Sequence, residues 1–369
     1  MKISAPSKDL LKAANSVSRS VPTKTTNPIL SCVHIQARNG RLTLSGTDGE
    51  LAAISSMPAE VIAEGEALIQ MRTMADLLRT YSEESTVEIS CDESSVVRFA
   101  TPSSDVKIQG RSVSEYPLPE LAALTSSVAL DAEMLSRMIR ETVFAASKLE
   151  GSSQSPSAMT GELVEIDSGM LRIVALNGFL MAIRQEALAI DSEMKCVVPA
   201  RALSELVRLL SQEEGEVHIE IGRSRFIASF GDTQLQSSLL SGEFINYSSI
   251  IPKDANTIIK ASVPELLESL ERASLMSDEK SVSVAYFKAS GTVLQIRSEN
   301  SDGSVSDELS VQLGGEEIEI AFNSKFLIEI LKAVPDERIV MEFSNPQSPG
   351  LIKPVGSENY LYLIMPVRL

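Results

Sequence analysis

The sequence of 369 residues contains few cysteines and no long apolar run. Its three cysteines, Cys32, Cys91 and Cys196, are far apart and form no CxxC pair. This spacing excludes a disulfide framework and indicates a reducing compartment. No stretch reaches the roughly 18 apolar residues of a membrane-spanning helix, and the amino-terminal segment lacks the apolar core of a signal peptide. We therefore expect a soluble, cytoplasmic protein.

Motifs of common catalytic sites are also missing. The sequence contains no GxSxG nucleophile elbow, no GxxxxGK(S/T) phosphate loop, no HExxH and no GxGxxG. The two histidines, His34 and His218, lie in alternating, strand-like stretches without a second His or Cys at ligand spacing. Asp48 and Glu50 lie in "GTDGE" between two alternating segments, which favours a hairpin turn over a metal site. We expect no enzyme activity, no metal and no cofactor.

Positive charge is scarce as well. The chain has 33 Lys and Arg against 50 Asp and Glu, a formal net charge of −17 and a pI near 4.7. Phosphate binding depends on clustered cations, so the overall balance argues against a nucleic-acid partner. Net charge is a sum, however, and does not tell where the cations lie.

One pattern of segments occurs three times along the chain, and repeats of this kind organise a whole fold. The copies are "ALIQMRTMADLLRTYSEESTVEIS" from Ala67, "CVVPARALSELVRLLSQEEGEVHIEI" from Cys196 and "IEIAFNSKFLIEILKAVPDERIVMEF" from Ile318. Each predicts a short strand, an amphipathic helix, a polar turn and another alternating strand. Equivalent helix positions carry the basic residues Arg72, Arg201 and Lys325 and, four residues later, the acidic residues Asp76, Glu205 and Glu329.

A second helix-like segment precedes each copy, at "SKDLLKAANSVSRSV" from Ser7, "DAEMLSRMIRETVFAASK" from Asp131 and "SVPELLESLERASLM" from Ser262. These three residues are of types that cap helices. Strand pairs around Gly or Asn turns follow, in "LTLSGTDGELAAI", "LRIVALNGFLMAI" and "LQIRSENSDGSV". The pattern predicts an α+β fold of three tandem domains, each a duplicated unit of a helix and antiparallel hairpins. We expect them to span residues 1–122, 123–250 and 251–369.

Basic residues recur on the polar faces of the predicted helices. At about 100° per residue, Lys8, Lys12 and Arg19 fall within about 40° of one another. Such faces attract phosphates without reading bases, so they would guide a DNA duplex without sequence specificity. Acidic residues interrupt these faces, and an ordinary solvated helix face is the alternative. The candidate residues for DNA contact are Lys8, Lys12, Arg19, Arg79, Arg137, Arg140, Lys148, Arg201, Arg208 and Lys332.

Six segments carry a resemblance to a known family by their order and spacing. They are "TNPILSCVHI", "LTLSGTDGEL", "VPARALSEL", "FINYSSIIP", "SLMSDEKS" and "YLYLIMPVRL". In them the chain resembles the DNA polymerase III beta subunit, the beta sliding clamp of bacterial replication, and the resemblance covers the whole chain. It implies that the three clamp domains form half of a six-domain ring, in which two chains encircle duplex DNA and tether the polymerase for processive synthesis. The implied partners are a second copy, double-stranded DNA, the replicative polymerase, the clamp loader and other proteins with clamp-binding peptides, without a membrane.

The resemblance also implies a hydrophobic groove beside the segment "YLYLIMPVRL", which by itself also suits a plain buried strand. Clamp-binding peptides insert apolar side chains there, and methionine and branched aliphatic residues suit varied peptides. The sequence departs from the family at "NGFL", Asn177–Leu180, where many members carry a polar turn such as "DGHR". This change puts the usual peptide preference in question. The matching groove positions are Met159, Leu176, Gly178, Phe179, Leu180, Met181, Ile245, Ser249, Ile250, Leu363, Ile364, Met365, Pro366, Val367 and Arg368.

Other positions match the family's ring interface and DNA contacts. In the family, an edge strand of the first domain pairs with an edge strand of the third domain of the other chain; Val106 and Ile108 match the first strand, and Leu275 and Met276 match the second. Lys24 matches a position that contacts DNA. The loop "LEGSSQSPS" matches a further DNA-contact loop without keeping its aromatic and Gln contacts.

Two alternatives to a general replication clamp stay open. The turn "NGFL" is compatible with a specialised clamp paralogue with an altered groove, serving plasmid replication or tolerance to a clamp-directed inhibitor. A monomeric scaffold that keeps the fold without closing a ring is the other. Mass in solution separates that case, because one chain has 39.9 kDa and a ring has twice that mass.

Overall fold

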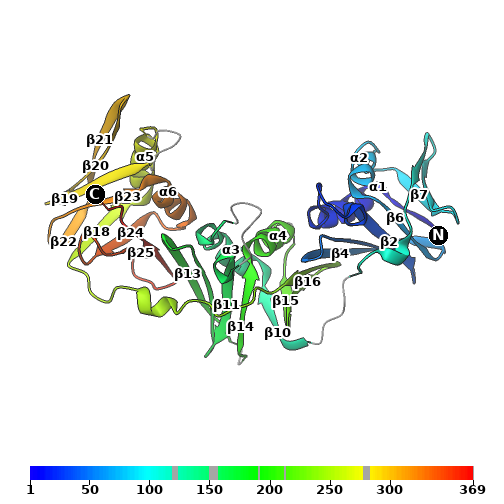
Figure 1. The fold of residues 1–369 in the computed structure, drawn as a ribbon, viewed down its shortest axis with the longest axis horizontal. Helices are drawn as coiled ribbons and strands as arrows, with labels where there is room; N and C mark the ends of the chain where they lie inside the picture. Colours follow the sequence, from blue (N-terminus) through cyan, green and yellow to red (C-terminus); the bar gives the residue numbers. More distant parts are fainter. Residues whose placement is uncertain (119–123, 149–156, 190–191, 212, 277–282, 369) are drawn as a thin grey trace. The chain divides into compact units, whose positions relative to one another are not determined.

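The computed structural model, drawn in Figure 1, describes residues 1–118, 124–148, 157–189, 192–211, 213–276 and 283–368. The side chains of residues 124 and 125 lie outside this description. The chain divides into two compact units. The first contains Met1–Ser136 and Glu205–Leu239, and the second contains Arg137–Ser204 and Leu240–Leu369. No helix among the described residues is both long enough and apolar enough to cross a membrane.

The first unit contains two antiparallel sheets and the helices α1 (Ser7–Val17) and α2 (Met71–Leu78). The five-stranded sheet has the order β5 (Glu60–Ala63), β1 (Lys2–Pro6), β7 (Thr86–Cys91), β8 (Val96–Thr101) and β9 (Ser104–Gln109). The eight-stranded sheet has the order β10 (Leu124–Asp131), β15 (Glu216–Gly222), β16 (Arg225–Phe230), β17 (Thr233–Ser238), β4 (Leu51–Pro58), β3 (Arg41–Thr47), β2 (Cys32–Arg38) and β6 (Gly65–Gln70).

The second unit also contains two antiparallel sheets, with the helices α5 (Val263–Ser274) and α6 (Ser324–Ala333). The nine-stranded sheet has the order β14 (Met194–Pro199), β11 (Gly161–Asp167), β12 (Met170–Leu176), β13 (Leu180–Ala187), β26 (Tyr360–Ile364), β25 (Gly350–Pro354), β24 (Arg338–Phe343), β18 (Thr257–Ser262) and β22 (Gln312–Gly315). The four-stranded sheet has the order β21 (Gly303–Ser310), β20 (Val293–Asn300), β19 (Val284–Ser290) and β23 (Ile318–Asn323).

The predicted repeat is present in the structure. Each copy of the quoted pattern forms a strand, a helix and a strand: β6–α2–β7, β14–α4–β15 and β23–α6–β24, with α4 at Ala200–Leu210. The preceding helices are α1, α3 (Ala132–Arg140) and α5. Both large sheets join strands of successive repeats, since β17 pairs with β4 and β13 pairs with β26. The sheets therefore continue through the sequence positions where we expect domain boundaries.

The predicted helix caps are correct in position at Asp131 and Ser262 and wrong at Ser7. The Asp131 side chain accepts a hydrogen bond from the backbone N–H of Met134, 2.7 Å away. Ser262 precedes α5 at the cap position, but its side chain makes no capping bond. Ser7 is the first residue inside α1, because Pro6 already has the extended backbone of a cap and the Ser7 N–H bonds to the carbonyl of Ser85. A proline cannot offer the side-chain oxygen that the serine prediction assumed.

Three equivalent hairpins end in turns with the same anchor. Asp48, Asn177 and Asn300 each accept two backbone N–H bonds at 2.8–3.1 Å from residues two and three positions later. The turn after Asp48 therefore forms a hairpin, as predicted. In the second turn Gly178 has φ of +85°, a conformation that favours glycine. The backbone of each turn is set by the anchoring side chain, whatever side chain follows it.

Candidate functional site

An apolar cluster covers one face of the nine-stranded sheet. Met159 and the strand residues Leu176, Met181 and Leu363 belong to it. Side chains of a strand alternate between the two faces, so the pairing of Met181 with Leu363 sends both to the same side. The structure therefore brings together four residues that the family resemblance places in a groove.

The segment that connects β17 to β18 packs on this cluster. Leu240, Phe244, Tyr247 and Ile251 contribute side chains to the packing. Ile245 and Ile250 instead expose 47% and 43% of their surface, and Ser249 is exposed beside them. The predicted groove residues of this segment therefore lie at the solvent side of the apolar cluster.

Two predicted groove residues lie on the opposite face of the sheet. Leu180 and Ile364 pair directly across β13 and β26 and are 2% and 1% exposed. Both belong to the main core of the second unit, under the helices. Period-two alternation therefore places their side chains on the face opposite to Met181 and Leu363, away from the apolar cluster that contains the other predicted groove residues.

The carboxyl-terminal segment is both a buried strand and an exposed border. Tyr360–Ile364 forms β26, whereas Met365 is 38% exposed and its N–H bonds to the carbonyl of Phe179 at 2.9 Å. Phe179 is 61% exposed, and its ring stacks on Phe326 with 5.9 Å between centroids.

The last described residues bond to β23 and line a cavity. The Val367 N–H bonds to the carbonyl of residue 321 at 2.8 Å. Pro366, Val367 and Arg368 line a cavity of about 600 Å³ together with Glu319 and Gln347.

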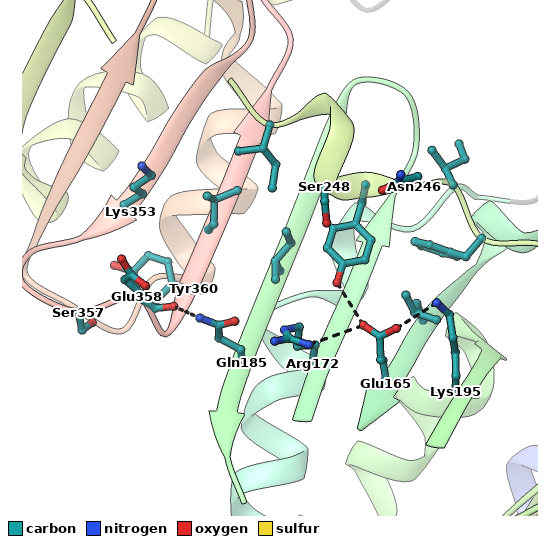
Figure 2. Close-up of a pocket in the computed structure, with 17 residues that line it drawn as sticks. Glu165, Arg172, Gln185, Lys195, Asn246, Ser248, Lys353, Ser357, Glu358 and Tyr360 are labelled. Atoms are coloured by element: carbon teal, nitrogen blue, oxygen red, sulfur yellow. Dashed lines mark hydrogen bonds and ion pairs between the residues drawn. The ribbon is translucent and has the colours of Figure 1, made fainter. Parts of the chain in front are cut away.

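A larger pocket of about 740 Å³ lies on the same face as the apolar cluster (Figure 2). Leu163, Ile183 and Leu361 of the cluster line it, together with Phe244 and Tyr247 of the connecting segment. Of the residues named from the sequence as a groove, Ile245 also lines this pocket. The sequence reasoning missed Phe244 and Tyr247, although both lie in the quoted segment "FINYSSIIP" at the three-residue spacing of one helical turn.

A half-buried carboxylate, Glu165, lies at the centre of the polar end of this pocket. Glu165, with 15% of its side chain exposed, lies 3.0 Å from the Lys195 amine and 3.9 Å from the Arg172 guanidinium. The Tyr247 hydroxyl donates to the same carboxylate at 3.3 Å. Burial and the neighbouring negative charge of Glu165 raise the pKa of Tyr247, so the hydroxyl keeps its proton and remains a donor.

Within the part of the chain that the structure describes, five of the candidate DNA-contact residues form the ion pairs given at the end of this paragraph. Arg208 also bonds to the carbonyl of Asn15 and is half-buried. The remaining candidates, Lys8, Arg19, Lys24, Arg140, Lys148 and Arg201, are exposed. The pairs are Lys12–Glu213 at 3.2 Å, Arg79–Asp76 at 2.8 Å, Arg137–Glu186 at 3.2 Å, Arg208–Glu205 at 2.9 Å and Lys332–Glu271 at 2.9 Å.

The loop that matches a further DNA-contact position lies almost entirely outside the described residues, which omit 149–156. Among the residues that are described, no group of three or more His, Cys, Asp and Glu side chains is arranged to hold a metal ion.

The predicted interface residues lie at the ends of their sheets or helices. Val106 and Ile108 are half-buried on β9, which is an edge strand of the five-stranded sheet. Leu275, 72% exposed, and Met276 directly follow α5. They do not lie on an edge strand themselves; the corresponding edge of the four-stranded sheet is β21, and Met276 Sδ lies beside its first residue, Gly303.

Comparison with known proteins defines the family. Models of the DNA polymerase III beta subunit match the chain in tandem, the N-terminal domain at residues 1–121, the central domain at 129–246 and the C-terminal domain at 248–368. The beta sliding clamp of Halalkalibacterium halodurans is 30% identical with 96% of each chain covered, and that of Pseudomonas putida is 27% identical with 98% of each covered.

Solved structures agree with this assignment. The DNA polymerase sliding clamp from Bacillus subtilis matches with a TM-score of 0.95 at 25% identity, covering 100% of this chain and 99% of that chain. The DnaN sliding clamp from Pseudomonas aeruginosa bound to griselimycin matches with a TM-score of 0.94 at 25% identity, covering all of both chains. The chain belongs to the DNA polymerase III beta subunit family, and the predicted α+β class with three tandem clamp domains is confirmed.

Proposed function

We propose that the protein is a DNA sliding clamp: a homodimeric ring that encircles duplex DNA and tethers the replicative polymerase. The observation that carries the proposal is the match of three beta-subunit domain models, in order, along nearly the whole chain. The names of the relatives support a general replication clamp and give no support to a specialised paralogue. We place its work in the cytoplasm, with a clamp loader and other peptide-bearing proteins as further partners.

The mechanism is topological and needs no catalytic group. A ring closed around DNA holds the bound polymerase at a high effective concentration near the DNA, because the polymerase cannot diffuse away between successive nucleotide additions. Weak phosphate contacts suit this task, since contacts without base readout permit sliding. Lys8, Arg19, Lys24, Arg140 and Lys148 are the strongest candidates for such contacts, because they are exposed and form no ion pair within the described residues.

For peptide docking, the apolar cluster supplies the floor and the exposed residues supply the rim. Met181 and Leu363 lie on the floor, and Phe179, Met365 and Ile245 lie at the rim. Methionine side chains adapt to differently shaped peptides. Leu180 and Ile364 support the groove indirectly, because their side chains pack into the core on the other face of the sheet and hold β13 and β26 in place.

For ring closure, β9 is the edge strand that would pair with a second copy. An unpaired edge invites pairing with another chain, and covering it in a closed ring removes that liability. We propose that Val106 and Ile108 contact Leu275 and Met276 of the second copy, with β21 as the facing edge.

Loading on circular DNA tests the proposal. The protein should elute at about 80 kDa, twice the 39.9 kDa of one chain. After loading by a bacterial clamp loader it should stay on an intact circle during gel filtration and leave once the circle is cut. Equal retention on cut and intact circles would contradict encirclement. Reversal of charge at Lys8, Arg19 and Arg140 should shorten retention, whereas reversal at Arg38, Lys253 and Lys260, also exposed, should not.

The groove is tested by removal of the carboxyl-terminal segment. A protein that ends at Ile364 keeps β26 but loses Met365, and we expect its affinity for a fluorescent peptide of the Gln-Leu-x-Leu-Phe kind to fall about 100-fold. Fluorescence anisotropy measures the affinity, and thermal unfolding checks that the fold is kept. Binding that survives the truncation would move the docking site away from this segment.

A further inference from the structure

The pocket of about 740 Å³ continues the proposed groove along one strand pair. Met181 pairs with Leu363 at the groove, and Ile183 pairs with Leu361 two residues further along, where the pocket begins. Two residues of extended chain span about 7 Å. A peptide anchored on Met181 and Leu363 therefore reaches the pocket with the residues that flank its anchor.

The two ends of the pocket differ in charge. Figure 2 shows Glu165, Arg172 and Lys195 at one end and Lys353, Ser357 and Glu358 at the other. Glu165 is one negative charge facing two cations, so that end carries one surplus positive charge in a chain of net charge −17.

The other end offers no such surplus. Lys353 forms an ion pair of 2.6 Å with Glu342, and Glu358 is exposed beside Gln185, whose side-chain amide bonds to the Glu358 carbonyl. A carboxylate there would meet the negative charge of Glu358 and no unpaired cation among these lining residues.

Lys195 is the cation that an incoming group can recruit. Its side chain is 66% exposed on a flexible stem, whereas Arg172 is 26% exposed. If Lys195 turns to a ligand, Glu165 keeps Arg172 and the Tyr247 hydroxyl as partners, so no buried charge is left alone.

We propose that this pocket binds an acidic side chain, Asp or Glu, in the segment that flanks the apolar anchor of a docked peptide, with Lys195 as its counter-ion. The inference rests on the proposed function of the groove. It makes Lys195 a specificity residue, which ranks partner peptides by the charge of their flanks.

Three peptides test the inference: the apolar anchor alone, the anchor extended at each end by two Gly-Ser spacers and two Asp, and the same extension with two Lys. At low salt the Asp extension should bind about three- to fivefold tighter than the Lys extension, as an exposed ion pair allows, and the difference should shrink in high salt. In K195E the preference should reverse, and in K195Q it should vanish. In K260E, which changes an exposed lysine on β18 of the same sheet, it should stay unchanged.

The outcomes separate the two proposals. Failure of the anchor peptide to bind at all would overturn the groove itself. Binding of the anchor with equal affinity for Asp and Lys extensions would overturn the acidic subsite and leave the groove intact. A preference for the Asp extension that persists in K195E would also overturn the acidic subsite, because another residue would then distinguish the charges of the extensions.

Discussion

The chain builds the same sheet joint twice, once in each unit. In the first unit β4 pairs with β17, and in the second unit β13 pairs with β26. In both joints the turn carbonyl accepts a bond from the residue at the end of the docked strand: Ser238 N–H to Glu50, and Met365 N–H to Phe179, each 2.9 Å. The backbone is the same, but the turn presents a carboxylate in one joint and an exposed phenyl ring in the other.

A tyrosine from a connecting segment packs on each unit's large sheet, Tyr116 in the first unit and Tyr247 in the second. The two tyrosines differ in how deeply they are buried. Tyr116 is 6% exposed, donates to the carbonyl of Ser45 at 3.2 Å and stacks on His34 with 5.9 Å between ring centroids. Tyr247 is half-buried, and beside it Leu163 occupies the position that His34 has 129 residues earlier. A large pocket lies there. The two joints show that a large pocket needs no new fold, because it can form where the segment over a sheet covers that sheet incompletely.

The largest expected effect on stability comes from Arg184, a buried arginine on β13 whose ion pairs and hydrogen bonds support the second joint. Arg184 is 4% exposed; it donates to Glu186 and to the carbonyl of Asn359, each at 2.7 Å, and its Nε lies 2.6 Å from Glu141 without hydrogen-bond alignment. R184M should cost about 3–5 kcal/mol of unfolding free energy, because Glu141 remains buried and loses the guanidinium that lies in contact with it. Denaturant unfolding measures the cost.

The control lies at the equivalent position of the first joint, where Ser55 faces Thr233 with 3.5 Å between hydroxyl oxygens. S55A should cost about 1 kcal/mol or less. Equal losses of unfolding free energy in R184M and S55A would show that the Arg184 interactions do not stabilise the second joint.

A buried acid on β11 gives the second unit a pH dependence. Glu162 is 0% exposed, one of its oxygens has no partner, and the other accepts from Thr142 at 2.5 Å. Burial raises its pKa from the ordinary 4.5 to about 8. The unfolded chain therefore loses this proton first, and stability falls as pH rises from 4.5 to 8.

E162V copies the equivalent strand of the first unit, β2, where Val33 is fully buried at the matching position. The variant should be more stable than the parent by on the order of 3 kcal/mol at pH 8, with little difference near pH 4.5. Urea unfolding across this range measures the slope, and E162Q should flatten it too. An unchanged slope in both variants would mean that Glu162 does not titrate in this window.

The smallest expected effect exchanges the two turn side chains. F179E gives the second turn the side chain of the first and should weaken peptide binding about tenfold, through loss of the exposed ring beside Met365. E50F, the matched change in the first turn, should leave binding unchanged. Both should unfold like the parent, since Asp48 and Asn177 still hold the turns. Tighter binding by F179E would show that the ring obstructs the groove.

The sequence predicted elements and repeats well because those follow from local periodicity. The three strand–helix–strand copies and the hairpins after residues 42, 171 and 294 are all present. Side-chain alternation also predicts which face of a sheet each residue occupies. In "YLYLIMPVRL" it places Leu363 and Ile364 on opposite faces. Family resemblance matches positions along the chain and does not distinguish the two faces of a strand, so it assigns both residues to the groove.

The pocket could not be foreseen in the same way. Glu165, Arg172 and Lys195 come from three strands, and their meeting depends on the register of β11 with β12 and β14. The two-residue turn Ser168–Gly169, with positive φ at both residues, sets the register of β11 with β12 and so pairs Glu165 with Arg172. No turn of this kind sets the register of β11 with β14, which brings Lys195 to Glu165. The ion pairs of Lys12 and Arg137 depend likewise on acids far along the chain, Glu213 and Glu186.

The anchored turn at Asn177 has a consequence for how partner choice can change. Its shape is held by the asparagine side chain and by Gly178, so the residue at position 179 contributes almost nothing to the hairpin itself. Yet its ring lies at the rim of the proposed groove, 61% exposed. If the proposed groove binds partner peptides, substitutions at position 179 change recognition at little cost in folding stability. New partner preferences can then evolve at this residue without stabilising mutations elsewhere.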